Sequence, residues 1–377
     1  MLTNIYSINQ LDYSKILQFN IEQKHNLIVI GHSGIGKTEM IAQAARSADY
    51  KCGYINLSVL ESPDMTGLPM IDKDLKITTY AAPQFLPLAE NTDEKPVVLI
   101  FDEIDKALPE LQNPCLEILQ YRTINGRKLN IHAIVATGNR PDENAHSNHL
   151  SHALTNRCKV YSLDFEIEPW LTWAANNNVN SLITGFLSSN REYVLKPDKS
   201  GDPFAYCNPS PRAWTYAAKD LDRLIRDNKS IDFQQMVIGG WVGKEASAKF
   251  RVWLEYYKDL QPIIEDWLKG GNYPNIDAPD KQMVLCISGL SVLADVCKIQ
   301  PSSKEEQEAK TKKIKLLVER VCGYLEGVGE DFITGATRAV LTPELINKNN
   351  LKEYEKFVNC FKKVFDLWQE FGVKFSQ

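Results

Sequence analysis

The chain has 377 residues, of which 44% are hydrophobic and 24% charged, and its formal net charge is −5 at pH 7. These fractions are typical of a globular protein, and the length allows two or three domains with a sizeable core. The negative charge argues against a generally basic surface that coats nucleic acid, although a local basic pore in an oligomer stays possible. No stretch approaches the roughly twenty apolar residues of a membrane span, and the N-terminus has no signal-peptide pattern. The eight cysteines include no C-x-x-C pair, so we expect a cytoplasmic protein with reduced thiols and no membrane partner.

Residues 1–24 are expected to form a short helical lead-in. From residue 25 to 167, short apolar strands alternate with helical patterns, which predicts an α/β fold: a parallel sheet with helices on both faces. The expected strands are Leu27–Ile30, Gly53–Leu57, Val97–Phe101, Ala133–Thr137 and Val160–Leu163.

Two segments interrupt this alternation. Residues 58–88 contain four prolines and are expected to form a loop or hairpin rather than a plain crossover helix. Asn125-Gly126, between two extended flanks, predicts a second hairpin over residues 121–131.

Beyond residue 168 the patterns are helical. Ser210 and Pro211 are expected at the N-cap and first position of one helix, and Ser302–Gly323 as a charged amphipathic helix. In the tail, apolar residues recur at helical spacing, which favours an internal packing face over a partner-binding helix. These residues are Phe357, Phe361, Val364, Phe365 and Trp368.

A phosphate-binding loop is predicted directly after the first core strand. The segment fits G-x-x-x-x-G-K-[ST] and lies between a strand and a helix, as this mechanism requires. Its glycines would let backbone N–H groups converge on a phosphate, while Lys37 would reach the β- and γ-phosphates and Thr38 would bind Mg²⁺. The loop comprises Gly31, His32, Ser33, Gly34, Ile35, Gly36, Lys37 and Thr38.

The strand over residues 97–101 ends in Asp102-Glu103. We expect Asp102 to hold Mg²⁺ and Glu103 to activate the attacking water, because hydrolysis needs a second carboxylate that nucleotide binding alone does not. Asp105 is expected at the surface. Asn139 follows the next strand, where its amide could contact the γ-phosphate or the water without adding charge.

Together with Leu154-Thr155-Asn156-Arg157-Cys158 and Pro209-Ser210-Pro211-Arg212-Ala213, these motifs follow the order of AAA+ ATPases. The chain most resembles the MoxR-like branch, in the group often encoded beside von Willebrand A-domain proteins. The resemblance covers roughly residues 24–270 and includes Gly138-Asn139-Arg140-Pro141-Asp142, Trp170-Leu171-Thr172-Trp173-Ala174 and Gly239-Gly240-Trp241-Val242-Gly243.

This resemblance implies a P-loop αβα core over residues 25–167 with strand order 5-1-4-3-2, a helical lid over 168–228 and a helical extension over 229–377. It places Arg157 as the arginine finger that reaches a neighbouring subunit's ATP, with Arg140 as a rival, and Arg212 as sensor 2 on the lid. A finger acting in trans requires an oligomer, and the family implies a ring, usually a hexamer.

The resemblance further implies a chaperone-like ATPase that uses ATP and Mg²⁺ to remodel a protein partner, with a von Willebrand A-domain protein as a possible adaptor. Two alternatives stay open. A nucleic-acid motor or loader is one, because Asn156-Arg157-Cys158 is similar to the Ser-Arg-Cys of clamp loaders; a nucleotide-gated scaffold with little turnover is the other.

Two features have no fixed role. His146, His149 and His152 would spread around a helix, which favours a polar subunit-interface loop over a metal site. MoxR-like proteins insert a pore-facing hairpin at the position of residues 58–88. This segment and residues 121–131 are candidate substrate contacts, with plain loops as the alternative. No role is predicted for residues 271–377.

Overall fold

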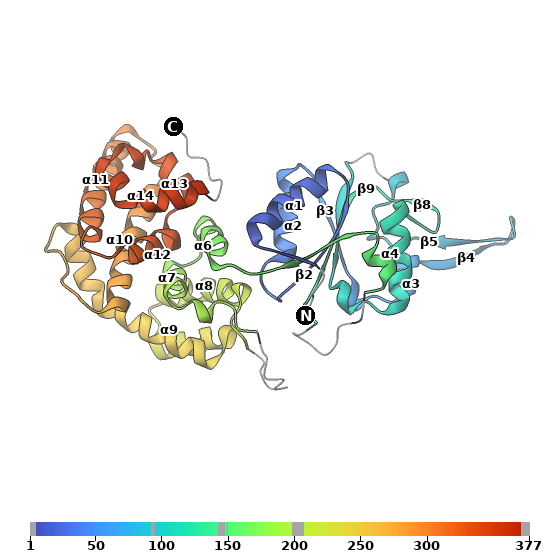
Figure 1. Ribbon diagram of the computed structural model, residues 1–377, viewed down its shortest axis with the longest axis horizontal. Helices are drawn as coiled ribbons and strands as arrows, with labels where there is room; N and C mark the ends of the chain where they lie inside the picture. The colour runs from blue at the N-terminus through green and yellow to red at the C-terminus, as the bar shows by residue number, and fades with distance from the viewer. Residues whose placement is uncertain (1–4, 92–94, 142–147, 149, 198–206, 371–377) are drawn as a thin grey trace. The chain divides into compact units, whose positions relative to one another are not determined.

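The computed structural model describes residues 5–91, 95–141, 148, 150–197 and 207–370. Contacts within the chain divide it into two compact units, Met1–Glu166 and Ile167–Gln377. Each is described by itself (Figure 1). Within the described residues, no helix is both long and apolar enough to cross a membrane.

Unit 1 contains a parallel sheet of six strands in its described residues, in the order β1-β10-β2-β9-β6-β3. The five predicted strands follow the predicted order 5-1-4-3-2. The sixth, β1, adds to the edge beside β10. The predicted helical lead-in is present as α1 (Gln10–Glu22), but strand β1 precedes it, because residues 6–8 pair with residues 161–163. The strands are β1 (Tyr6–Ile8), β2 (Asn26–Gly31), β3 (Cys52–Asn56), β6 (Val97–Asp102), β9 (Ile131–Gly138) and β10 (Lys159–Leu163).

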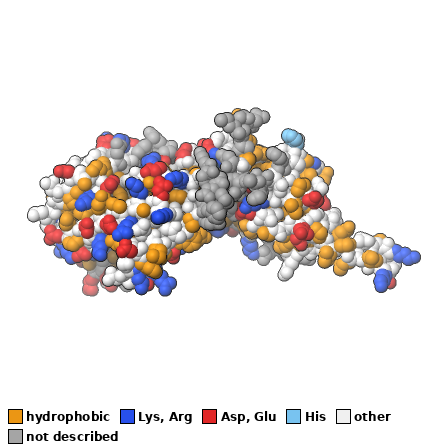
Figure 2. Space-filling view, turned by 90° about the horizontal axis from the view of Figure 1, so that it is seen from below, with side chains coloured by type: hydrophobic (Ala, Val, Ile, Leu, Met, Phe, Trp, Pro, Cys, Tyr) orange, Lys and Arg blue, Asp and Glu red, His pale blue; other side chains and the backbone are white. Residues whose placement is uncertain are grey.

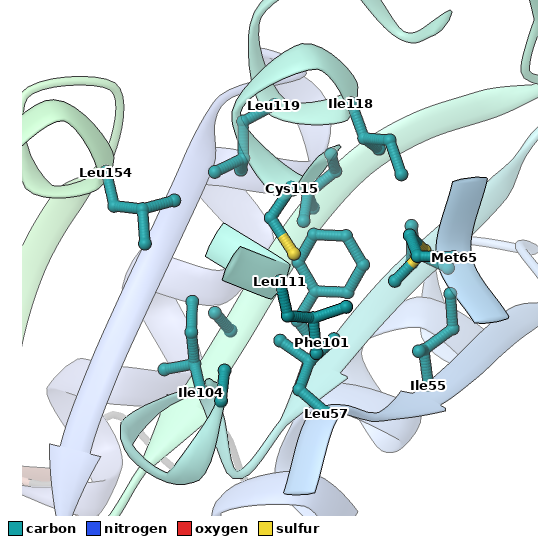
Figure 3. Packing of buried hydrophobic residues seen from close by; sticks show 14 of the residues in the cluster. Ile55, Leu57, Met65, Phe101, Ile104, Leu111, Cys115, Ile118, Leu119 and Leu154 are labelled. Carbon is teal, nitrogen blue, oxygen red and sulfur yellow. The ribbon is translucent and has the colours of Figure 1, made fainter. Parts of the chain in front are cut away.

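Helices cover both faces of this sheet, which explains why the central strands are continuous apolar runs. Helices α1 (Gln10–Glu22) and α2 (Lys37–Ser47) pack together on one face, and α4 (Pro109–Tyr121) lies on the other (Figure 1). Between α4 and the sheet, Leu111 and Cys115 meet Phe101 of β6 (Figure 3). This packing fixes the strands that carry the site.

Both predicted hairpins are present. The first follows η1 (Leu57–Val59) and α3 (Ser62–Thr66), and its antiparallel strands β4 (Leu68–Asp72) and β5 (Ile77–Ala81) project from unit 1 (Figure 1). The second joins β7 (Thr123–Ile124) to β8 (Arg127–Lys128). Its turn residues Asn125 and Gly126 have φ values of 49° and 77°, as a type I′ turn requires. Short elements complete the unit: η2 (Ala89–Asn91), η3 (Ile104–Lys106) and α5 (His152–Thr155).

In unit 2 the described residues contain helices and no strand, as predicted. Helix α10 packs against α7, α9, α11 and α12. Ser210 caps α8 by accepting a hydrogen bond from the backbone N–H of Ala213, and the apolar stripe of α14 is buried, so both predictions are confirmed. The division into lid and extension at residue 228 stays a prediction. The helices are α6 (Ile167–Asn176), α7 (Ser181–Ser189), η4 (Arg191–Tyr193), α8 (Pro211–Arg226), α9 (Ile231–Lys269), α10 (Pro279–Lys298), α11 (Lys304–Leu325), α12 (Glu330–Val340), α13 (Pro343–Lys348), η5 (Leu351–Glu353) and α14 (Glu355–Glu370).

The β7–β8 turn gives a test of this fold. A methyl group at Gly126 would meet no atom within 4 Å, so Gly126→Ala changes only backbone strain. We expect the variant to lose about 1 kcal/mol of unfolding free energy, because an L-residue at this φ costs about 1–2 kcal/mol. Gly126→Asn is the matched control, since asparagine tolerates the left-handed region. Urea denaturation measures both, and an alanine variant as stable as the asparagine variant would contradict the turn geometry.

Candidate functional site

The predicted site residues of unit 1 follow three neighbouring strands. The phosphate loop follows β2, the Asp102-Glu103 pair ends β6, and Asn139 follows β9. Because these strands are parallel neighbours in the order β2-β9-β6, their carboxyl ends meet at one edge of the sheet. Ligands bind at this edge in open α/β sheets.

The phosphate loop is built from left-handed glycines and a buried lysine. Gly34 and Gly36 have φ values of 76° and 95°, which glycine adopts without strain. Helix α2 begins at Lys37, so the N–H groups of its first turn open into the loop. The Lys37 side chain is only 7% exposed and turns back over the loop. Its Nζ donates to the carbonyls of Gly31 at 2.7 Å and His32 at 2.8 Å.

Asp102 is the most connected carboxylate of the site. It accepts hydrogen bonds from Tyr54 Oη at 2.8 Å, from Thr38 Oγ1 at 3.2 Å and from Thr137 Oγ1. Tyr54 and Thr38 donate to Oδ2, whereas Thr137 donates to Oδ1, which also accepts the backbone N–H of Glu103 at 3.1 Å. The paired oxygens of Thr38 and Asp102 are of the kind that Mg²⁺ takes beside phosphate oxygens and water. These two oxygens would hold Mg²⁺ together with oxygens of a bound phosphate.

Glu103 lies on a strained turn and is held by neighbours. Its φ is 56°, in the left-handed region that is costly for a residue with a side chain. Lys106 Nζ lies 3.1 Å from its Oε1. Burial raises the pKa of Glu103, but hydrogen bonds from Ser58 and Lys106 and the charge of Lys106 outweigh it, and the pKa is lowered. Glu103 is therefore a carboxylate at neutral pH.

Asn139 is placed next to the phosphate loop. Its Oδ1 accepts from Lys37 Nζ at 3.2 Å, and its backbone N–H donates to Asp105 Oδ1 at 3.0 Å. Asp105 is only 5% exposed, so its predicted surface position was wrong. It turns inward because the backbone after Glu103 forms the short helix η3.

Sequence reasoning also missed two partners of Asp102. Thr137 lies in the predicted strand before Asn139 and is fully buried, and the indication available in the sequence was a hydroxyl residue within an apolar run. Tyr54 is half-exposed on β3, and nothing in the sequence pointed to it.

Residues 26–158 match the family described as AAA domain, dynein-related subfamily. Residues 26–158 are an AAA domain. Among solved structures, two point variants of Thermotoga maritima RuvB are similar to this chain, each with a TM-score of 0.38 and 16% sequence identity. The two matches cover 69% and 70% of this chain and 78% of each RuvB chain. The Thermotoga maritima RuvB Holliday junction branch migration motor has a TM-score of 0.36 and 16% identity, over 79% of this chain and 84% of that chain. Curated proteins include no significant sequence match.

The two candidate finger arginines lie at opposite edges of the AAA domain. Arg140 is at the edge that carries the site, where it forms an ion pair with Asp164 and donates to Ser162 Oγ at 3.2 Å. Arg157 precedes β10, and its carbonyl accepts from Asn26 Nδ2 at 3.1 Å, at the start of β2. Its Nε donates to Gln120 Oε1 at 2.8 Å. Six residues of β2 separate this edge from the phosphate loop, a span of about 20 Å.

The remaining candidates are outside the AAA domain or only partly described. Arg212 is exposed in the first turn of α8, in unit 2. His152 begins α5 and is exposed, whereas His146 and His149 lie outside the described residues.

The ion pair of Glu103 gives a test of the site that needs no substrate. In Lys106→Met the pKa of Glu103 should rise, because one hydrogen bond and one positive charge that favour the carboxylate are removed. A carboxyl ¹³C NMR titration measures it. Lys95→Met, which removes an exposed partner of Asp49, is the control and should leave Glu103 unchanged. An unmoved pKa in Lys106→Met would contradict the pairing.

Proposed function

We propose that this chain is an ATPase that hydrolyses Mg²⁺-bound ATP at the carboxyl edge of its sheet. The observation that supports it is the convergence of Lys37, the Thr38–Asp102 pair, Glu103 and Asn139 at one edge. Each of these groups meets a different need of phosphoryl transfer: charge on the phosphates, a metal site, a base for water, and a neutral contact to the γ-phosphate.

Lys37 and the loop would hold the phosphates. The N–H groups around Gly34 and Gly36 donate to the β-phosphate, and Lys37 exchanges its bonds to the Gly31 and His32 carbonyls for phosphate oxygens. Asn139 keeps its Oδ1 toward Lys37, which leaves its Nδ2 to donate to the γ-phosphate.

Glu103 would take the proton of the attacking water. In the structure its carboxylate is engaged by Lys106 and Ser58, and these bonds compete with a water for the same oxygens. Turnover therefore requires that Glu103 exchanges at least one of these bonds for water when ATP is bound. The lowered pKa keeps the residue a carboxylate, and loss of one of these bonds would raise its pKa and so make it a stronger base.

Arg157 would act on the ATP of a neighbouring subunit. From the amino edge of the sheet it lies about 20 Å from its own phosphate loop, beyond the reach of one side chain. Arg140 lies at the same edge as its own site and is neutralised by Asp164, which suits a role within its own chain. We infer a ring in which each site is completed by the next subunit, hexameric in the MoxR-like manner, with Arg212 closing over the nucleotide.

The β4–β5 hairpin is the proposed contact to a protein client or adaptor. Its exposed side chains are largely apolar, and Figure 2 shows hydrophobic residues along the projecting arm, with charges toward its tip. Apolar contact favours a protein over a nucleic-acid backbone, which would select a basic surface. The exposed apolar residues are Leu68, Met70, Ile71, Leu75, Ile77 and Tyr80.

Glu103→Gln tests this function. The variant should bind ATP as the wild type does and lose at least about a hundredfold in kcat, because the amide cannot accept the proton of water. Calorimetry measures binding, and phosphate release measures turnover. Glu90→Gln is the matched control, since Glu90 is an exposed carboxylate of the same unit that pairs with Arg127. Hydrolysis at the wild-type rate in Glu103→Gln would refute the assigned base.

A further inference from the structure

Asp105 lies on the same turn as Glu103 but faces the opposite way. Glu103 and Lys106 are partly exposed and pair with each other, whereas Ile104 and Asp105 are buried, at 1% and 5% exposure. The left-handed φ of Glu103 produces this division, because it redirects the chain into η3. One short turn therefore carries the proposed base outward and a second carboxylate inward.

Two hydrogen bonds connect the carboxylate of Asp105 to Lys37, and both involve Asn139. Asp105 Oδ1 accepts the backbone N–H of Asn139 at 3.0 Å, and Asn139 Oδ1 accepts from Lys37 Nζ at 3.2 Å. The bond to Asp105 holds the backbone from which the Asn139 side chain extends. A shift of this backbone would therefore move the Asn139 amide relative to the phosphate loop.

Close packing keeps Asp105 in this place. A Cβ at Gly138 would lie 3.1 Å from Asp105 Oδ1 and 2.8 Å from Ile30 Cδ1, so a side chain there would crowd Asp105 and displace the end of Ile30. From the other side, Asn148 clamps the turn: its N–H donates to the Asp105 carbonyl at 2.6 Å and its Nδ2 to the Ala107 carbonyl at 3.1 Å.

The burial of Asp105 needs a reason. Burial raises the pKa of this carboxyl, and the hydrogen bond from Asn139 opposes the rise. A carboxylate out of water is costly unless it is hydrogen-bonded, so an apolar side chain would serve a purely structural turn better. A carboxylate at this buried position is explained if its hydrogen bond to the Asn139 backbone holds Asn139 in place at the site.

We propose that Asp105 is a positioning residue, which fixes the Asn139 amide against Lys37 and so couples contact with a γ-phosphate to the turn that carries Glu103. This role rests on the proposed ATPase function. In this role Asp105 would contact neither ATP nor the attacking water. It would fix the position of the Asn139 backbone. Because the two are hydrogen-bonded, a shift of Asn139 would also shift the turn that carries Glu103 and Asp105.

Asp105→Ala and Asp105→Asn test the proposal. Asp105→Ala should lower kcat at least about tenfold, the effect of one lost buried hydrogen bond, while the Kd for ADP stays within about threefold. Asp105→Asn should recover most of kcat, because its Oδ1 can accept the same N–H. In an Asn139→Ala background, Asp105→Ala should have little further effect on kcat, since the side chain that it positions is gone.

Gln112→Ala is the matched control. Gln112 is also 5% exposed and its Oε1 accepts the backbone N–H of Ser151, so Gln112→Ala should also lower stability but change kcat by less than about threefold. Three results would each overturn the proposal. The first is a kcat of Asp105→Ala within twofold of wild type, and the second is a kcat of Asp105→Asn no higher than that of Asp105→Ala. The third is a double variant whose loss of kcat is the product of the losses in Asp105→Ala and Asn139→Ala.

Binding separates this proposal from the ATPase activity. The preference for a non-hydrolysable ATP analogue over ADP, measured as a ratio of Kd values, should fall at least about fivefold in Asp105→Ala. This holds even for a wild-type chain that shows no turnover, an outcome that would refute the proposed ATPase alone. An unchanged ratio would overturn the role of Asp105.

Discussion

The carboxylate of Asp102 ties four segments of the AAA domain to one point at the carboxyl edge of the sheet. Tyr54 comes from β3, Thr38 from α2, Thr137 from β9, and Asp102 itself ends β6. Hydrogen bonds to a carboxylate are about twice as strong as neutral ones, so they hold these strand ends in fixed register. The places of Lys37, Glu103 and Asn139 follow from this register. These strand ends are in place before a ligand arrives, so the rearrangement that remains on binding is the exchange of hydrogen bonds by Lys37 and Glu103.

The two edges of the sheet carry different parts of the proposed site. Its carboxyl edge brings together the phosphate loop, two carboxylates and an amide, all anchored within the AAA domain. Its amino edge carries Arg157, held by Gln120 and the Ala153 carbonyl. Because the strands are rigid and about 20 Å long, the two edges of one chain do not meet. The proposed ring resolves this geometry, since neighbouring copies can place one edge against the other.

Much of this arrangement could be predicted from sequence, because strands and motifs are local patterns. The five core strands, both hairpins and the cap at Ser210 each depend on a few consecutive residues. Strand β1 was missed because three residues carry no periodicity, and only pairing with β10 makes them a strand. Asp105 was misplaced for a related reason: one left-handed residue, Glu103, decides which way the next side chains face, and φ is invisible in a pattern of polarity. Tyr54 and Thr137 contact Asp102 only through strand register.

The most direct test of a site completed between subunits is the ATPase rate of mixed rings. Arg157→Ala and Glu103→Gln should each be inactive alone. Mixed in equal amounts, they should regain hydrolysis, because about a quarter of randomly formed interfaces join an intact Glu103 to an intact Arg157. Arg140→Ala mixed with Glu103→Gln is the control and should show no such gain, since Arg140 is placed to act in its own chain. Mixtures of Arg157→Ala and Glu103→Gln that are no more active than the separate proteins would contradict a shared site.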